Sequence, residues 1–332
     1  TNASENSKKN LLRSLFYFLP LAIRKHLSYV QHKKVLRELI NFCHKNHIAH
    51  IHVEFADLAA FLTVYAAKEL DISFSLSVHA ADIFSSRYCL KTLCHRAKFI
   101  SVCNNTAAAA LIKKYPRAEK KLQLIYHGLE LKDWQFRESL ELQKPLELFF
   151  AGRFVEKKGI FILLEAFSIL QKQGLELKLT LAGSGPLQEE LQAKAEELQI
   201  TDKLKWCGVL TRMQIAQELQ RVDILCLPSL QDSENNQEGI PNIMVEAMAS
   251  GVPVAGSMTG GIGELLNEET GYTIRNINPQ KLADTITEII ENKEERNRKR
   301  KNAREIVEKR FDAKKHARQR RRLLENVICR NS

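Results

Sequence analysis

The fold of this chain is decided by one stretch, Gln237-Glu238-Gly239-Ile240-Pro241-Asn242-Ile243-Met244-Val245-Glu246-Ala247-Met248-Ala249-Ser250-Gly251. Pro241 suits the first position of a helix, where a missing N–H costs nothing. Gly251 suits the left-handed position just past a helix end. The stretch therefore predicts a helix over Pro241–Ser250. Its first amides are unpaired donors at the positive end of the helix dipole, which is a place to hold a phosphate.

Two carboxylates lie eight positions apart in this stretch, Glu238 before the helix and Glu246 inside it. They would repel a phosphate that they touched. We therefore interpret them as acceptors for hydroxyl groups on either side of the anion, as on a sugar and a ribose. The alternative is a solvated charge on an amphipathic helix.

Strands and helices alternate on both sides of this stretch. The expected strands of the second half lie at 146–150, 175–181, 203–206, 224–227, 252–255 and 272–274, with helices between them. Such alternation is typical of βαβ units and predicts an α/β fold with parallel sheets. A polar stretch at 132–144 indicates a domain junction. The expected parts are an N-terminal domain (1–140), a C-terminal domain (143–312) and a basic C-terminal helix (313–332).

The loop after the first strand of the second half carries two positive charges. Gly152 lets a ligand approach the backbone, and Arg153 and Lys158 flank the start of the next helix. A planar fork beside a point charge suits a diphosphate. Ala182–Pro186 predicts a tight turn that lines the same site, and Thr259–Glu264 predicts a loop near it.

A metal site is not expected. The chain has seven scattered cysteines, which are typical of reduced thiols, and the close pair Cys89 and Cys94 lacks a second pair at zinc spacing. No Asp-x-Asp motif occurs. The remaining candidates are four histidines without a carboxylate or cysteine to complete a set: His44, His47, His50 and His52.

Charge is concentrated at the C-terminus. Residues 291–332 contain 16 lysines and arginines and seven acidic residues, a net charge of +9, whereas the other 290 residues carry +2. The basic runs are Arg296–Lys301 and Lys314–Arg322. An amphipathic helix is predicted over Leu11–Val30, and no apolar run is long enough to span a membrane. The tail indicates a solvated helix face, an anionic membrane surface or nucleic acid.

The motifs of the second half resemble those of retaining family 4 (group 1) glycosyltransferases, whose fold, GT-B, has two Rossmann-like domains. The resemblance rests on Gly-Arg-x4-Lys-Gly at Gly152–Gly159, the Ala182–Pro186 turn, Leu-Pro-Ser at Leu227–Ser229, Glu-x7-Glu at Glu238–Glu246 and Gly-Gly-Ile-x-Glu at Gly260–Glu264. The first half is similar to the bacterial exopolysaccharide and colanic-acid type, through His50–Phe55 and His79–Phe84. This implies parallel sheets facing across a cleft, with the last helix returning to the first domain.

The resemblance also implies roles for individual residues. Arg153, Lys158 and the backbone of Gly239, Ile240, Pro241 and Asn242 would hold the diphosphate of a nucleotide sugar, with Gly152 beside it. Glu238 would bind sugar hydroxyls, Glu246 the ribose, and His79 would lie across the cleft near the reacting carbon. Asp82 is a candidate for the acceptor side. The expected enzyme is a metal-independent, retaining hexosyltransferase without a cofactor.

The expected donor is a UDP-sugar or GDP-sugar, and the expected acceptor a glycan or polyprenyl-diphosphate-linked glycan of cell-surface polysaccharide or lipopolysaccharide synthesis. The expected location is the cytoplasmic face of the cell membrane, with no nucleic acid bound. The family's first strand and glycine loop are not found before His50, which indicates a truncated chain or a shortened N-terminal domain. Two alternatives are kept: a catalytically weak sugar-nucleotide-binding subunit, favoured if that first strand is absent, and a GT-B sugar-nucleotide epimerase, an enzyme of the same architecture.

Overall fold

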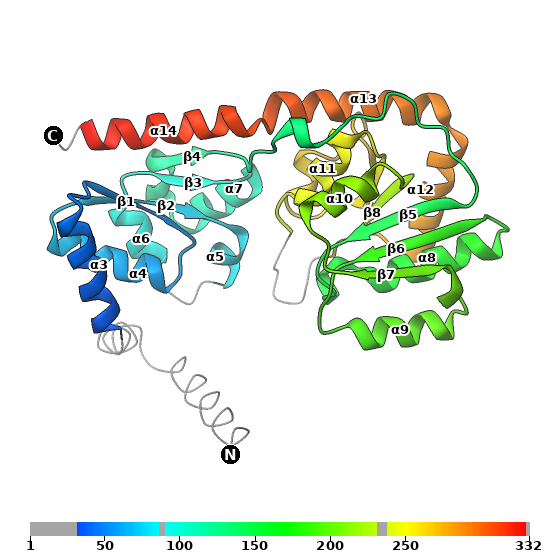
Figure 1. Ribbon diagram of the computed structural model, residues 1–332, viewed down its shortest axis with the longest axis horizontal. Helices are drawn as coiled ribbons and strands as arrows, with labels where there is room; N and C mark the ends of the chain where they lie inside the picture. The colour runs from blue at the N-terminus through cyan, green and yellow to red at the C-terminus, as the bar shows by residue number, and fades with distance from the viewer. Residues whose placement is uncertain (1–31, 86–89, 231–237, 330–332) are drawn as a thin grey trace, which may run out of the picture.

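The structure, a computed structural model, describes residues 32–85, 90–230 and 238–329. It contains two α/β domains that lie side by side, and a pair of C-terminal helices runs along one side of both (Figure 1). The expected fold class is therefore confirmed. The helix predicted over Leu11–Val30, and residues 231–237 before Glu238, lie outside the described residues.

The N-terminal domain is built on a four-stranded parallel sheet in the order β1-β2-β3-β4. Its strands are β1 (His50–Glu54), β2 (Ser73–Val78), β3 (Ile100–Val102) and β4 (Leu122–Leu124). The helices are α3 (Lys33–Lys45), α4 (Leu58–Glu69), α5 (Ala80–Ser85), α6 (Leu90–Arg96) and α7 (Asn105–Lys114). The carboxyl ends of β2, β3 and β4 lie in register, since Val78 pairs with Val102 and Val102 with Leu124. Residues that follow these strands therefore meet at one edge.

The C-terminal domain is built on a six-stranded parallel sheet in the order β10-β9-β8-β5-β6-β7. Its strands are β5 (Leu146–Ala151), β6 (Leu177–Ala182), β7 (Leu204–Gly208), β8 (Ile224–Leu227), β9 (Val254–Ser257) and β10 (Tyr272–Ile274). The helices that connect them are α8 (Ile160–Lys172), α9 (Gln188–Glu197), α10 (Arg212–Leu219) and α11 (Asn242–Ser250). Leucine and phenylalanine side chains of α8 are fully buried against this sheet.

The strand order reverses at β5, which pairs with β6 on one side and with β8 on the other. In open α/β sheets, ligands bind in the crevice outside the carboxyl ends of the strands at such a switch point. The loops after β5 and β8 touch here: a Cβ at Gly159, whose φ is +63°, would lie 1.9 Å from the carbonyl oxygen of Pro228. The topology thus brings the Gly152–Gly159 loop to the same crevice as α11.

The C-terminal helices α12 (Pro279–Glu291), α13 (Lys293–Arg310) and α14 (Ala313–Cys329) complete the molecule. Helix α14 returns to the N-terminal domain, as expected, because Gln319 donates to the Leu124 carbonyl at 3.1 Å and Arg320 pairs with Glu54 at 2.9 Å. Within the described residues, no helix combines the length and apolarity needed to cross a membrane.

Candidate active site

A cavity of about 540 Å³ lies between the two domains, at the switch point of the second sheet. The N-terminal domain contributes His79, Ala80, Cys103, Asn104 and His127, and the C-terminal domain contributes Ala151, Gly152, Lys157, Lys158, Ile215, Glu238, Gly239, Ile240, Pro241, Asn242, Ile243 and Glu246. The cavity therefore brings together Lys158, Glu238, Glu246 and the start of α11, and adds His79, which only the resemblance had related to them.

Helix α11 directs its N-terminus into this cavity. The sequence predicted Pro241 as the first helical residue, but the helix begins one residue later. Pro241 caps it: its ψ of 131° is extended, and its carbonyl accepts a hydrogen bond from the Met244 amide at 3.0 Å. The amides of Asn242 and Ile243 have no helical carbonyl to donate to. Gly251 ends the helix in the left-handed conformation that was predicted, with φ of 75°.

The loop that contains Gly260 supports the approach to α11. Gly261 donates to the carbonyl of Glu238 at 2.8 Å, and a Cβ at Gly260 would lie 2.0 Å from that same oxygen. Since Gly260 also has φ of +55°, only glycine fits there without strain. The loop thus braces the backbone of Glu238 and Gly239 from behind, outside the cavity lining. The turn at Ala182–Pro186 also stays outside the lining and packs on Gly152 and Phe154.

Lys158 and Glu238 form an ion pair inside the cavity. Their Nζ and Oε2 atoms are 2.9 Å apart, and the two side chains are 13% and 15% exposed. Glu238 Oε2 is buried without a well-angled hydrogen bond to the described residues, so the contact is one of charge. Arg153 is exposed and does not line the cavity, whereas Lys157, four residues later in the same loop, does. An anion that binds Lys158 here must therefore first displace the Glu238 carboxylate from it.

Glu246 lies one to two helical turns into α11, facing the cavity. Burial raises the pKa of its carboxyl group from 4.5 to about 7, and Arg212 opposes this only in part. Near neutral pH the carboxyl group therefore exists in both forms. A bound group that donates hydrogen bonds would favour the carboxylate.

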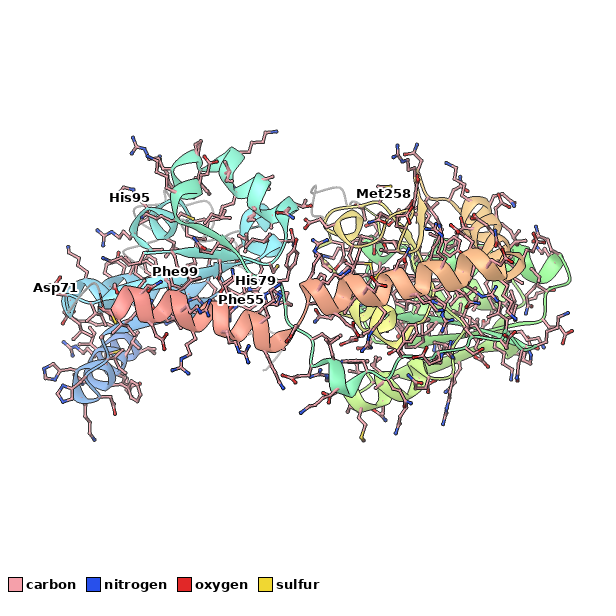
Figure 2. The ribbon with its side chains drawn as sticks, turned by 90° about the horizontal axis from the view of Figure 1, so that it is seen from above. Phe55, Asp71, His79, His95, Phe99 and Met258 are labelled. Atoms are coloured by element: carbon pink, nitrogen blue, oxygen red, sulfur yellow. The ribbon has the colours of Figure 1, made fainter. Side chains whose placement is uncertain are left out.

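His79 follows β2 and lies on the opposite wall. Figure 2 shows it beside Phe55 at the end of the N-terminal domain that faces the C-terminal domain. The two rings stack, and their centroids are 4.2 Å apart. Burial works to lower the pKa of His79, but hydrogen bonds with Cys103 and Glu54 raise it to about 9. The Glu54 Oε2 atom is 3.4 Å from His79 Nε2. The positively charged imidazolium of His79 therefore lies across the cavity from the N-terminus of α11.

Asp82 does not reach the acceptor side that the resemblance implied. It is 7% exposed, and its carboxylate accepts the amides of Ala56 at 2.9 Å and His79 at 2.8 Å. It therefore joins the loops after β1 and β2, and positions His79 through the backbone. A short acid four residues after a strand end can accept an amide three residues before it, which explains its spacing from His79.

His50 and His52 are held by serine hydroxyl groups. The ring nitrogens of His50 lie 2.7 and 2.8 Å from Ser73 and Ser75, and those of His52 lie 2.6 and 3.0 Å from Ser75 and Ser77. These histidines thus have a structural role in pairing β1 with β2.

Two cavity residues carry chemistry that the sequence analysis missed. Cys103 follows β3, and His127 lies three residues after β4. Burial works to raise the pKa of Cys103, but hydrogen bonds with His127 and His79 lower it to about 6. The signal that could have found them is their position after successive strands of one parallel sheet.

Glu264 joins the two domains beside the cavity. Its carboxylate accepts the backbone amides of Asn105 at 2.9 Å and Thr106 at 2.6 Å, and the Thr106 hydroxyl group at 2.9 Å. These amides are the first of α7, so a C-terminal-domain carboxylate occupies the positive end of an N-terminal-domain helix. The two walls of the cavity are held together by this contact.

Comparisons with known proteins agree with this geometry. The sequence profile described as "Glycosyl transferases group 1" matches residues 132–306. The glycosyltransferase WcaL of Salmonella typhimurium, named for colanic acid biosynthesis, is 28% identical over 182 residues, which cover 54% of this chain and 45% of that relative. This chain therefore spans about half the length of the relative.

Two solved structures share the fold. Sucrose-phosphate synthase of Thermosynechococcus elongatus superposes with a TM-score of 0.75 at 20% identity, over 91% of this chain and 79% of that one. Anabaena HepE, solved in complex with UDP and glucose, has a TM-score of 0.70 at 19% identity, over 88% and 82%. The profile match covers more than half of the sequence, and the chain belongs to the group 1 glycosyl transferases.

Proposed function

We propose that the chain is a retaining hexosyltransferase that moves a sugar from a UDP-sugar or GDP-sugar to a glycan or a polyprenyl-diphosphate-linked glycan, in the synthesis of a cell-surface polysaccharide. One observation carries this proposal. The cavity combines a lysine and an open helix N-terminus with two carboxylates on one wall, and an imidazolium faces them from the other domain. A nucleoside diphosphate sugar has the complementary sequence of charge and hydroxyl groups.

The diphosphate is proposed to lie between Lys158 and the first amides of α11. As the bond between the anomeric carbon and the diphosphate breaks, negative charge grows on the leaving oxygen. Fixed positive groups in a closed cleft stabilise that charge more than they stabilise the ground state. Since these groups supply the positive charge, the proposed reaction uses neither a metal nor a cofactor. Arg153 would join them by turning in from its exposed position.

The carboxylates are proposed to position the two sugars. Glu246 accepts the ribose hydroxyl groups, and Glu238 accepts those of the transferred sugar once Lys158 has turned to the diphosphate. Retention follows from attack on the face that the diphosphate leaves. The acceptor oxygen bonds to the anomeric carbon, and its proton passes to the departing phosphate oxygen, so no side-chain nucleophile is required.

Phe55 is proposed for the acceptor side in place of Asp82. Its side chain is 47% exposed, and its backbone has φ of 68°, which a bulky side chain rarely adopts. It stacks on His79, which lines the cavity, although Phe55 itself does not. An aromatic face held there can pack against the C–H face of an acceptor sugar, beside the imidazolium.

Nucleotide binding tests the donor assignment. Thermal shifts with UDP, GDP, ADP and their sugars should identify the base, because a ligand that binds the folded state raises the apparent stability. We expect UDP or GDP to stabilise the protein and ADP to have little effect. The absence of any shift with all three would contradict the assignment. Proton NMR of the product's anomeric centre would then decide between retention and inversion.

The two alternative functions predict different products. Hydrolysis or transfer of the sugar requires an active transferase, whereas a weak binding subunit would bind the nucleotide sugar and leave it intact. An epimerase would return a changed sugar still attached to the nucleotide. Incubation with the stabilising sugar nucleotide, followed by chromatography, separates the three outcomes.

A further inference from the structure

We propose that His79, Cys103 and His127 form a binding site for Zn²⁺ in the cleft, and that Zn²⁺ bound there inhibits the enzyme. One ligand atom of each residue lies within 4.8 Å of the other two. The three residues line the same cavity, so the fourth coordination position faces the open cleft. The binding half of this proposal is independent of the function proposed above, and the inhibitory half rests on it.

The convergence of these ligands follows from the topology of the first sheet. His79 comes directly after β2, Cys103 directly after β3, and His127 shortly after β4. The ends of these strands are in register, so the residues gather at one edge although 24 positions separate each from the next. The His79 and His127 rings are stacked at an angle of 5°, with centroids 5.4 Å apart, so at least one ring must rotate for both to direct a nitrogen lone pair at one ion. Bonds of about 2.0–2.3 Å to one Zn²⁺ would require the three atoms to move closer by roughly 1 Å, within the reach of side-chain rotation.

The chemistry of the ligand set excludes the oxygen-preferring ions. Two imidazoles and a thiolate suit Zn²⁺ and also copper, whereas Mg²⁺, Ca²⁺ and Mn²⁺ prefer oxygen ligands. Three protein ligands with an open fourth position are the arrangement of sites that exchange water or substrate.

A carboxylate already supports the first ligand from outside. Glu54 lies 3.4 Å from His79 Nε2, and Arg320 of α14 holds Glu54 at 2.9 Å. Histidine ligands of metals usually have such an outer partner on the second ring nitrogen. The proposal therefore assigns the Nδ1 atom of His79 to the metal.

Inhibition follows from the position of the site. A Zn²⁺ ion held by His79 would remove that imidazolium from the wall that faces α11. It would also occupy the space beside Glu238, where the donor sugar is proposed to lie. We expect Zn²⁺ and the nucleotide sugar to compete.

Cobalt binding tests the site without any activity. Co²⁺ should be added to the reduced, tag-free protein, and the thiolate-to-cobalt charge-transfer band in the near ultraviolet recorded. We expect one equivalent to produce the band and Zn²⁺ to remove it. Cys103→Ser should abolish the band, and His127→Ala should weaken binding roughly 100-fold or more, since even an outer partner contributes about 10- to 100-fold.

Matched controls lie away from the cleft. Cys207→Ser changes a half-buried cysteine of β7, and His95→Ala changes an exposed histidine of α6; both should keep the band. No band in the wild-type protein, or an equal band in Cys103→Ser, would contradict the metal site. His79, Cys103 and His127 would then be only a hydrogen-bonded cluster.

The inhibitory half is tested by binding of the UDP-sugar or GDP-sugar with and without Zn²⁺. We expect Zn²⁺ to weaken binding of the stabilising nucleotide sugar in the wild-type protein and not in Cys103→Ser. Unchanged binding in the presence of bound Zn²⁺ would overturn the inhibition. If no nucleotide sugar binds under any condition, the proposed function fails, while the cobalt spectrum still decides the metal site.

Discussion

Lys158 is the residue whose role the structure sharpens most. It is nearly buried, it points into the cavity, and its charge is held by Glu238 at 2.9 Å until a stronger anion arrives. This exchange of partners explains how a lysine and a glutamate can lie together in an anion site. In the absence of ligand each compensates the desolvated charge of the other.

Replacement of the positively charged side chains proposed to bind the diphosphate should slow the reaction strongly. We expect Lys158→Ala and Arg153→Ala each to lower kcat by about two to three orders of magnitude, the scale of losing a transition-state donor. Lys172→Ala, an exposed lysine at the end of α8, serves as the control and should retain full turnover. Steady-state kinetics with the identified donor provide the measurement. Near-wild-type turnover in Arg153→Ala would show that this arginine stays outside the cavity.

Glu246 predicts a dependence of stability on pH. Its carboxyl group has a pKa of about 7 in the folded protein and 4.5 ordinarily, so the folded state holds the extra proton between these values. The contribution to stability is therefore lost as the pH rises through this window. Glu246→Gln should be more stable than wild type by about 1–3 kcal/mol at about pH 8, and equal to it below about pH 4.

The same variant should bind nucleotide more weakly, because a neutral amide is a poorer acceptor for two ribose hydroxyl groups than a carboxylate. Urea unfolding at both pH values and nucleotide titration check the two halves. Glu190→Gln, an exposed acid of α9, should change neither quantity. If Glu246→Gln binds nucleotide as tightly as wild type, Glu246 does not contact the ribose.

At the scale of elements, α7 and the Gly260–Glu264 loop determine how the cleft is closed. Glu264 accepts two backbone amides and a hydroxyl group from the start of α7, across 158 or 159 positions of sequence. A carboxylate at a helix N-terminus is stabilised both by these hydrogen bonds and by the helix dipole. These hydrogen bonds are partly shielded from solvent, so removal of the Glu264 carboxylate leaves the first amides of α7 without their acceptor.

Glu264→Ala should therefore loosen the closed arrangement. We expect a loss of about 0.5–2 kcal/mol in stability, the range for removal of a helix-capping acceptor, and a larger radius of gyration in small-angle scattering. Glu268→Ala removes an exposed acid four residues later and provides the control. An unchanged radius of gyration together with unchanged stability would show that Glu264 does not hold the domains together.

At the scale of the whole molecule, the structure divides the basic C-terminus into two parts with different roles. Arg296, Lys299 and Arg300 of α13 are 2–8% exposed and donate to backbone carbonyls at the ends of neighbouring elements. They stabilise the C-terminal domain and do not form a charged surface. Exposed basic residues lie on both helices. On α13 they are Lys293, Arg298, Lys301 and Lys309, of which Lys293, Arg298 and Lys309 pair with glutamates. On α14 they are Lys314, Lys315, Arg318, Arg321 and Arg322.

We propose that α14 brings the protein to the cytoplasmic face of an anionic membrane. Several lysines and arginines on one element attract acidic lipids by about 1 kcal/mol each near the surface. Sedimentation with phosphatidylserine vesicles at low salt should recover the protein in the pellet, and high salt should release it. Reversal of Arg318, Arg321 and Arg322 to glutamate should abolish sedimentation. A control with Lys172, Lys178 and Lys203 reversed should still sediment, and failure of the wild type to sediment at low salt would contradict the proposal.

Much of the architecture was predictable because its signals are local. The alternation of strands and helices, the Gly251 helix end and the glycine loop after β5 each depend on residues within a few positions of one another. The parallel sheets follow from these local signals, whereas the return of the last helix to the first domain was implied by the family resemblance. The Glu238 and Glu246 spacing likewise placed both carboxylates at one cavity.

Only the tertiary structure could decide which side chains meet. In the structure Asp82 is buried and accepts the His79 amide, and Arg153 stays exposed. Lys158 pairs with Glu238, and one sheet edge carries His79, Cys103 and His127. These outcomes depend on strand register and on contacts between residues far apart in the chain. The sequence by itself determined the helices and strands, because these depend on local backbone preference. Only the tertiary packing decided which groups surround each charged side chain, because desolvation and ion pairing depend on distance in space.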